Sequence, residues 1–324
     1  MKALVLGAGG FIGGHLAKRL KNEGYYVCGI DLKIPEFNDS ACNVFIIGDL
    51  RDKAFCEAHI DSTYDEVYQL AADMGGAGYL FSGENDYNVM SNSVQINLNV
   101  SQIAIAHSIK KIFFSSSACI YPKQNQSDHN NPMCREDSAY PADPDSEYGW
   151  EKLFSERLFL SASRNHKLDV RIARFHNVYG TEGTWDTGKE KAPAALCRKV
   201  AEAKEGDTIE IWGSGKQTRS FLYIDDCLNG IRKLMQSDFT GPVNIGSEEM
   251  ISINDFANMI IAISGKTISI KNIEGPVGVN GRTSDNTLAN QSIGFYPQIS
   301  LLEGITNTYH WINQQIMESQ KATV

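Results

Sequence analysis

Two side chains in the middle of the chain have the types and the spacing of a site that oxidises a hydroxyl group. Tyr148 and Lys152 form a Y-x-x-x-K motif within YGWEK, and this spacing puts both side chains on one face of a helix. An ammonium group beside a phenol lowers the pKa of the phenol. A phenolate at Tyr148 could therefore take a hydroxyl proton while hydride leaves the carbon.

Ser117 and Cys119 lie in the stretch SSSACIYP (115–122), which follows the apolar run KIFF, where a buried strand is expected to end. Y-x-x-x-K alone is common by chance, but Ser117 at the strand end makes the constellation specific. Cys119 has two interpretations. Most buried cysteines act as small apolar core residues, whereas a thiolate beside this constellation could transfer protons.

A glycine-rich turn lies at the start of the sequence. Gly7, Gly10 and Gly13, with a further glycine at position 9, follow the apolar run KALVLG and precede an amphipathic stretch at 11–23. Such glycines allow a tight turn and let backbone N–H groups approach a pyrophosphate at the start of a helix. A glycine triplet alone indicates only a flexible turn, but its place between a strand and a helix predicts a dinucleotide site.

Asp31 ends the second expected strand, where its carboxylate can accept hydrogen bonds from the adenosine ribose hydroxyls. The same charge would repel a 2′-phosphate, so NAD is favoured over NADP, although the nearby Lys33 weakens this argument. Asp49 and Leu50, after the third strand, would border the adenine, and a helix cap is an equal alternative for Asp49. The residues expected to bind the cofactor are Gly7, Gly10, Phe11, Ile12, Gly13, Asp31, Asp49, Leu50, Tyr148 and Lys152.

These residues need a framework of alternating strands and helices, and the first half of the chain has that pattern. Short apolar runs alternate with longer amphipathic stretches, which predicts right-handed βαβ units and an α/β fold with a parallel, doubly wound sheet of the Rossmann type. The expected strands are 2–7, 26–30, 43–48, 66–72, 111–116 and 170–174, and the expected helices are 11–23, 51–59, 88–107 and 147–162.

After about residue 175 the pattern loosens into a smaller α/β lobe. We therefore expect a dinucleotide-binding Rossmann domain over residues 1–175 and a mainly substrate-binding lobe over residues 176–324, with the chain crossing between them. The strands expected in the second half are 208–212, 220–224 and 242–246, its helices lie near 192–204, 225–236, 253–263 and 300–317, and the loops are 123–146 and 180–191.

The composition excludes several classes of protein. The net charge is −9 and no block of Lys and Arg occurs, which argues against nucleic-acid binding. The seven cysteines are scattered and include no C-x-x-C, so neither a disulfide framework nor a zinc site is expected, and a cytoplasmic location fits. No histidine pair has metal-ligand spacing, no apolar run approaches the ~18 residues of a membrane span, and no signal peptide is recognisable.

The glycine turn, Ser117, Tyr148 and Lys152 together resemble the short-chain dehydrogenase/reductase superfamily. The length, the glycine spacing and the second lobe resemble its extended branch, which acts on nucleotide sugars. Further blocks are similar to the GDP-mannose 3,5-epimerase family, from the glycine turn to near residue 315. These blocks are AADMGGAGYL (71–80), SSACIYP (116–122), YGWEK (148–152), RFHNVYG (174–180), EKAPAALCRK (190–199), IWGSGKQTRSF (211–221), PVNIGSEEM (242–250) and GRTSDN (281–286).

The resemblance implies a reaction and a site. This family oxidises C4 of the hexose with tightly bound NAD, epimerises C5 and C3 beside the ketone, re-reduces C4, and forms homodimers. Its oxidising groups match Ser117, Tyr148 and Lys152, and its acid/base cysteine and lysine match Cys119 and Lys191. The substrate contacts that it implies are Gly75, Ser117, Ala118, Cys119, Asn177, Glu190, Lys191, Ala192, Lys199, Gln217, Thr218, Arg219 and Arg282.

Residue chemistry supports an epimerase independently. Sugar-nucleotide dehydratases carry T-D-E where this chain has Ser117, Ala118 and Cys119; their aspartic acid protonates the departing C6 hydroxyl and their glutamate removes the C5 proton. Ala118 cannot supply that acid, whereas a Cys119 thiolate could still remove a proton beside a ketone, which favours epimerisation over loss of water. Lys191 and the nicotinamide charge could lower the thiol pKa if the fold brings them close.

Several of these residues have plainer alternatives. Lys191 could be a solvated loop lysine, but Pro193 indicates a helix start, where a positive charge is unfavourable without a purpose. Arg219 and Arg282 could lie on the surface, yet guanidinium groups in glycine-rich turns suit a diphosphate. Loop 81–94, which borders the sugar pocket, is slightly longer than in the family, so the exact hexose stays open, and two other functions remain as alternatives. One is an enzyme acting on another GDP-manno sugar, such as a GDP-heptose, or at fewer centres; the other is a catalytically silent NAD-binding protein.

Overall fold

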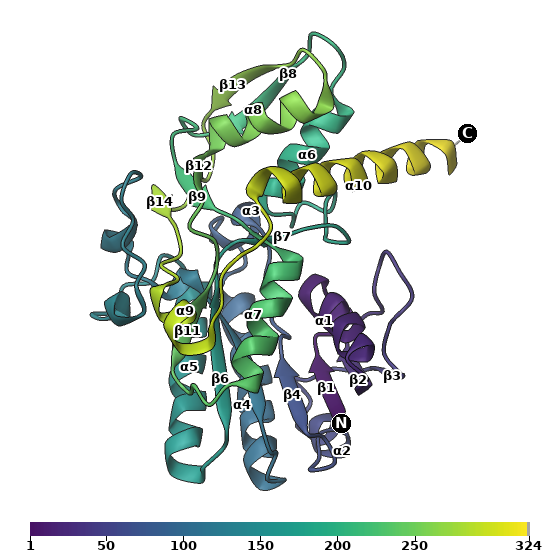
Figure 1. Ribbon diagram of the computed structural model, residues 1–324, viewed down its shortest axis with the longest axis vertical. Coiled ribbons are helices and arrows are strands. Elements are labelled where there is room, and N and C mark those ends of the chain that lie inside the picture. The colour runs from purple at the N-terminus through teal and green to yellow at the C-terminus, as the bar shows by residue number, and fades with distance from the viewer. Residues whose placement is uncertain (323–324) are drawn as a thin grey trace.

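A seven-stranded sheet, in which every neighbouring pair of strands is parallel, forms the centre of the computed structural model, which describes residues 1–322 (Figure 1). Its strands are β1 (Lys2–Leu6), β2 (Tyr26–Asp31), β3 (Val44–Ile47), β4 (Glu66–Gln69), β5 (Ile112–Ser117), β6 (Val170–Phe175) and β11 (Pro242–Ile245). The strand order is β3-β2-β1-β4-β5-β6-β11. Successive strands are added on one side of β1 up to β3 and on its other side from β4 onward, so the crevice for a ligand lies at the carboxyl ends of β1 and β4.

Helices cover both faces of this sheet, as a parallel sheet requires. Ala3 and Val5 of β1 belong to one core with residues of α1 and α7, while Leu4 and Leu6 belong to a second core with residues of α4 and α5. This alternation along β1 is the two-residue period of a strand that is buried on both sides. The helices are α1 (Phe11–Asn22), α2 (Lys53–His59), α4 (Asp86–Ala106), α5 (Glu147–His166) and α7 (Ile224–Gln236).

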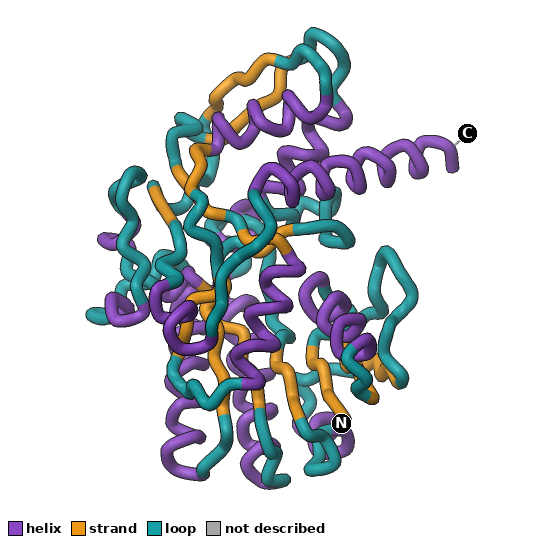
Figure 2. The backbone as a smooth tube through the Cα atoms, viewed as in Figure 1, coloured by secondary structure: helices purple, strands orange, loops and turns teal. Residues whose placement is uncertain are grey.

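The remaining elements form a second group above the carboxyl ends of the sheet, and α10 extends away from it to one side (Figure 1). Figure 2 shows loops running between this group and the sheet. Two short strands pair as β7 (Val178–Tyr179) and β10 (Leu222–Tyr223), two longer ones as β8 (Thr208–Trp212) and β13 (Ser269–Ile273), and three form the sheet of β12 (Met250–Ser252), β9 (Thr218–Ser220) and β14 (Gly281–Arg282). The helices of this group are α3 (Ala77–Leu80), α6 (Ala192–Glu202), α8 (Ile253–Ser264) and α10 (Leu301–Ala322), whereas α9 (Thr287–Ile293) lies beside β11 of the main sheet (Figure 1).

The fold class predicted from the sequence, a doubly wound parallel sheet of the Rossmann type, is confirmed. One strand lies elsewhere than the sequence pattern suggested. The segment 242–246, grouped above with the smaller lobe, forms β11 beside β6 in the main sheet, because Val243 and Ile245 are fully buried there. The expected strand 220–224 is also divided between β9 and β10. Within residues 1–322, no helix has both the length and the apolar composition that crossing a bilayer requires.

A buried ion pair fixes α5 to the sheet just behind the end of β5. Glu156 of α5 accepts two hydrogen bonds of 2.9 Å from the guanidinium of Arg174 on β6. The hydroxyl of Ser116 on β5 donates to the same carboxylate at 2.5 Å. Since α5 and β5 carry the residues singled out above, this pair sets the position of one relative to the other.

Replacing Glu156 with alanine should lower the free energy of unfolding by about 3–5 kcal/mol, because Arg174 is left as a buried charge without its partner. Glu57→Ala removes an exposed ion pair with Lys53, whose atoms are 3.8 Å apart, and should cost less than about 1 kcal/mol. Urea unfolding followed by circular dichroism measures both variants. Equal losses would contradict the structural role assigned to the buried pair.

Candidate active site

The residues with oxidation chemistry meet at the carboxyl end of β5. Ser117 is the last residue of that strand, and a single 3-10 turn (Ala118–Ile120) follows it, in which the Cys119 N–H donates to Ser117 Oγ at 3.2 Å. Tyr148 lies in the first turn of α5 and packs against Cys119. Gly149 allows this approach, because a Cβ at that position would lie 2.2 Å from the Cys119 carbonyl oxygen.

Tyr148 and Lys152 share one face of α5, as the spacing predicted. The Lys152 Nζ lies 5.6 Å from the centre of the Tyr148 ring and 3.9 Å from Glu151 Oε2. Burial lowers the pKa of Lys152, and the Glu151 carboxylate opposes that shift. Burial also raises the pKa of Tyr148 well above its usual value, against a lowering by a hydrogen bond with Ser117. The sequence predicted a lowered pKa for this phenol, but in the chain alone burial raises that pKa.

A buried polar network behind Lys152 was not identified from the sequence. Asn97 of α4 donates to Glu151 Oε1 at 2.9 Å and accepts from Gln69 of β4 at 2.8 Å, and Ser155 donates to the same Glu151 oxygen at 2.7 Å. Glu151 Oε2 is buried and has no hydrogen-bond partner within residues 1–322. Glu151 lies inside YGWEK, so its position was visible, but nothing in the sequence indicated that it faces inward.

Cys119 is in direct contact with a cation. The Arg282 Nη1 donates to Cys119 Sγ at 3.2 Å, while its Nε donates to Gln126 Oε1 at 2.5 Å and its Nη2 to Asp145. Burial raises the pKa of the Cys119 thiol, and the Arg282 charge is the largest influence that lowers it. The sequence suggested Lys191 as the cation near the thiol and a diphosphate as the partner of Arg282; in the structure Arg282 is the cation that touches the sulfur.

Lys191 is the residue at which α6 begins, and Pro193 lies in the first turn of that helix, as expected. Burial lowers the pKa of Lys191, while charges on Cys119 and Cys227 raise it, so the ammonium and the Cys119 thiol are within electrostatic reach. The neighbouring Glu190 accepts a 2.8 Å bond from Arg198 through Oε1. Its Oε2 is buried without a partner among the described residues, and so is available to a ligand.

The other expected substrate residues fall into two sets. The first is spread over several segments: Ala118 is within the catalytic turn, Gly75 is buried against Tyr79, Ala192 follows Lys191, and Asn177 Nδ2 donates to the Ser220 carbonyl at 2.8 Å.

The second set belongs to the second group of elements, and its side chains bond backbone carbonyls. Lys199 donates to Glu210 at 2.6 Å, Gln217 donates to Trp212 at 3.0 Å, and Thr218 donates to His129. Arg219 lies beside Arg282 across the β9–β14 pairing and donates to the carbonyls of residues 218, 277 and 279. The ion pairs within residues 1–322 do not include Arg219, and burial lowers its pKa to about 10.

The glycine turn has the shape that a dinucleotide requires. Gly7 has φ of +89°, and a Cβ there would lie 2.8 Å from the Ala71 nitrogen at the end of β4. A Cβ at Gly13 would lie 2.0 Å from the Gly7 carbonyl oxygen, so α1 can approach the turn only with glycine at this position. Gly10 caps α1 without a side-chain hydrogen bond, which leaves the helix N-terminus open to a pyrophosphate.

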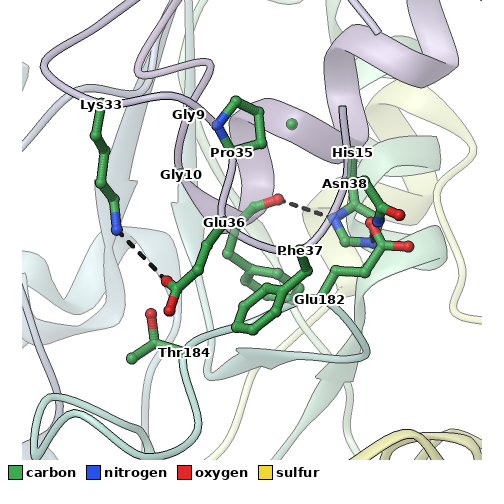
Figure 3. Close-up of a pocket in the computed structure, with 12 residues that line it drawn as sticks. Gly9, Gly10, His15, Lys33, Pro35, Glu36, Phe37, Asn38, Glu182 and Thr184 are labelled. Atoms are coloured by element: carbon green, nitrogen blue, oxygen red, sulfur yellow. Dashed lines mark hydrogen bonds and ion pairs between the residues drawn. The ribbon is translucent and has the colours of Figure 1, made fainter. Parts of the chain in front are cut away.

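A pocket beside this turn is lined by residues of the turn, of the segment after β2 and of the loop near Thr184 (Figure 3). Asp31 accepts from the Gly9 N–H at 2.9 Å and so lies next to the turn. The Lys33 Nζ faces Glu36 at 3.7 Å, which partly neutralises the cation that could have attracted a 2′-phosphate (Figure 3).

The remaining cofactor candidates lie around the same turn. Phe11 and Ile12 begin α1 and pack against one hydrophobic core, and Leu50 is buried in the other. Asp49 pairs with Arg51 at 2.7 Å, which lowers the pKa of the carboxyl, and α2 is capped by Asp52 instead. The residues present therefore fit a dinucleotide.

Comparison with known proteins agrees with this geometry. The model of the NAD dependent epimerase/dehydratase family matches residues 3–246. A GDP-mannose 3,5-epimerase of Arabidopsis thaliana is 45% identical over 99% of this chain and 84% of its own length. The GDP-mannose 3,5-epimerase 1 of Oryza sativa subsp. indica is 43% identical over 98% of this chain and 82% of its own length. The resemblance inferred from the sequence blocks is thereby confirmed.

Solved structures share the fold over nearly the whole chain. A UDP-glucuronic acid 4-epimerase from Bacillus cereus, in complex with UDP-glucuronic acid and NAD, is 29% identical with a TM-score of 0.82, over 97% of this chain and 100% of that one. A UDP-glucose 4-epimerase from Thermotoga maritima has the same TM-score at 23% identity, covering 98% and 100%, which shows the common fold. The chain therefore belongs to the NAD dependent epimerase/dehydratase family, and its cofactor is NAD.

Proposed function

We propose that the chain is a nucleotide-sugar epimerase of the GDP-mannose 3,5-epimerase type, which inverts C5 and C3 of the hexose beside a transient C4 ketone. The observation that carries this proposal is the position of Cys119, whose thiol touches the Arg282 guanidinium and packs against Tyr148. A base next to the oxidising phenol is useful only if a carbon beside the oxidised one must lose its proton. The two plant relatives described above carry the name of this activity.

The oxidation step is served by groups on β5 and α5. When bound, NAD would supply the acceptor for the hydride of C4 and the donor for its return. Tyr148 takes the proton of the C4 hydroxyl, and Ser117, which lowers the pKa of the phenol, orients the same hydroxyl. The ammonium of Lys152, one turn along α5, stabilises the phenolate that this transfer requires.

Epimerisation is served by Cys119 and Lys191. A ketone at C4 acidifies the C–H bonds at C5 and C3, so the Cys119 thiolate removes a proton and the Lys191 ammonium delivers one. The two groups come from different elements, the turn after β5 and the start of α6, so they can address opposite faces of the ring. Ala118 offers no acid to a departing hydroxyl, which leaves inversion as the outcome.

Residues 176–324 mainly bind the nucleotide sugar in this proposal, and residues 1–175 bind NAD. Arg219 has no carboxylate partner within residues 1–322, so its charge is available to the diphosphate. The unpartnered Oε2 of Glu190 can accept a sugar hydroxyl. Lys199 and Gln217 would exchange their bonds to backbone carbonyls for bonds to the ligand.

We also propose a cytoplasmic homodimer. Trp150 and Phe154, one turn apart on α5, are 40% and 46% exposed, and Tyr87 at the start of α4 is 82% exposed. Helices α4 and α5 pack side by side, so these large side chains lie on one pair of helices, as in many interfaces.

The cytoplasmic location is supported by the cysteines. All seven are free thiols, which suits a reducing compartment.

The Cys119→Ala variant should separate oxidation from epimerisation. Ser117, Tyr148 and Lys152 are unchanged, so the variant should still form NADH with GDP-mannose, while deuterium uptake at C5 and C3 in heavy water falls by about 10²–10⁴-fold. NADH absorbance and NMR mapping of deuterium measure the two steps, and Tyr148→Phe is the control that should lose both. Undiminished deuterium uptake would make Cys119 a core residue and would refute the proposed chemistry.

The Arg282→Gln variant should need a higher pH for ring-proton exchange. Arg282 lowers the pKa of the Cys119 thiol, so its removal raises that pKa, and the protonated thiol cannot act as a base at pH values below it. The pH profile of deuterium uptake should therefore move upward by about one pH unit or more. Arg282→Lys keeps the charge and should move the profile less. An unmoved profile in Arg282→Gln would show that this guanidinium does not set the charge of Cys119.

The double variant Trp150→Glu/Phe154→Glu should be monomeric, because two carboxylates would be buried without partners at the proposed interface. Light scattering coupled to size-exclusion chromatography measures the mass of the variant against that of the unchanged protein. Leu302→Glu, which alters a side chain 53% exposed on α10, is the matched control and should stay dimeric. A dimer in the double variant would place the interface elsewhere.

A further inference from the structure

The short segment 73–80 connects the two acid/base groups of the site. At its end, Leu80 packs in one cluster with Cys119 and Tyr148, and Tyr79 packs against that cluster. At its centre, the Gly76 N–H donates to the Lys189 carbonyl at 2.8 Å. One segment thus contacts both the turn that carries the proposed base and the loop that leads into Lys191.

A second contact holds the same two segments together. The Lys189 Nζ lies 4.0 Å from the centre of the Tyr79 ring, within the range of a cation–π contact. The Tyr79 hydroxyl donates to Asp73 at 2.9 Å, and the Asn92 amide donates to the other oxygen of Asp73 at 2.8 Å. The Tyr79 ring is therefore held in place by α4, and Lys189 lies against a fixed surface.

Gly76 is at the point of closest approach between the two segments. A Cβ there would lie 2.1 Å from the Glu190 carbonyl oxygen, which is backbone and cannot turn aside. The φ of Gly76 is −75°, a value that alanine adopts without strain, so the need for glycine at this position is purely steric. Two residues on, a Cβ at Gly78 would meet only the Trp212 ring, at an ordinary 3.5 Å.

We propose that Gly76 and Tyr79 are positioning residues, which fix the backbone of residues 189–190 and thereby hold Lys191 at a fixed position relative to Cys119. This inference rests on the proposed role of Lys191 as the acid of epimerisation. Lys191 is the residue at which α6 begins, so the place from which its side chain starts depends on the backbone of residues 189–190 that leads into the helix. The contacts of the two preceding residues with segment 73–80 constrain that backbone.

The consequence differs between the two steps of the reaction. Hydride transfer uses Ser117, Tyr148 and Lys152, which lie on β5 and α5 and do not depend on residues 189–190. Proton exchange with inversion needs the base and the acid at fixed positions on the two faces of the ring, and a displacement of about 1 Å can cost about 10²-fold. A shift of the chain before Lys191 should therefore lower exchange much more than oxidation.

The test is the ratio of deuterium incorporation at C5 and C3 to NADH formation, measured on the NAD-loaded enzyme with GDP-mannose in heavy water. In Gly76→Ala this ratio should fall by about 10²-fold, because the added methyl group displaces Glu190 and with it Lys191. Gly78→Ala adds the same methyl group two residues away and should stay within about twofold of the unchanged protein. A loss of folded protein lowers both quantities together and leaves the ratio unmoved.

Each outcome decides the matter. An unchanged ratio in Gly76→Ala, or an equal fall in Gly78→Ala, would overturn the inference. If Gly76→Ala does not fold, Tyr79→Leu, which removes the ring under Lys189, replaces it: a fall in its ratio supports the inference and no fall overturns it. Lys191→Ala is measured alongside. If Lys191→Ala leaves the ratio intact, the acid role itself is refuted, whereas a low ratio in Lys191→Ala with a normal one in Gly76→Ala refutes only the positioning role.

Discussion

The contact between the Arg282 guanidinium and the Cys119 sulfur joins the two parts of the molecule where the chemistry is expected. Arg282 belongs to β14, in the sheet above the carboxyl ends of the main strands, and Cys119 follows β5 at the centre of the main sheet. A buried guanidinium needs acceptors for its N–H groups, and Gln126 and Asp145 supply them from the long loop 123–146. One cation thus fixes a loop, a second sheet and a strand-end turn relative to one another.

Burial and charge act against each other throughout this site. Burial raises the pKa of Tyr148 and Cys119 and lowers the pKa of Lys152 and Lys191, so it favours the neutral form of all four groups. Each group that must carry charge therefore needs a nearby partner of opposite sign. Arg282 meets that need for Cys119, and Glu151 meets it for Lys152, 3.9 Å away. The same burial makes each of these interactions stronger than it would be in water.

Local spacing made much of this site predictable from the sequence. The Tyr148–Lys152 pair depends only on the period of one helix, and Gly7 and Gly13 depend on one strand, one turn and one helix, so all four lie where they were expected. Contacts between distant segments were not predictable in that way. Arg282 and Cys119 are 163 residues apart, and no periodicity in the sequence relates them.

The role of Gly76 illustrates the same limit in a short motif. The glycines of MGGAG were visible in the sequence within the block AADMGGAGYL, and the expectation there was that Gly75 contacts the substrate. The structure adds a requirement that only the folded chain reveals, because the backbone that approaches Gly76 is that of Glu190. The segment 242–246 shows the same limit. A short apolar run can pair with any free strand edge, and only the folded chain shows that this run forms β11 beside β6.

In the proposed mechanism, the turn after β5 separates the residues that oxidise the sugar from the residues that decide the product. Gly149 allows α5 to meet this turn through backbone atoms, at the Cys119 carbonyl oxygen. The approach of α5 to this turn therefore depends on a backbone contact as well as on the packing of Tyr148 against the Cys119 side chain. In the proposed mechanism, the chemistry of the side chains at positions 118 and 119 selects the step that follows oxidation. With alanine at 118 and a thiol at 119, the ketone of the proposed mechanism would have a base beside it but no acid for a leaving group, and inversion is the reaction that these two residues would permit.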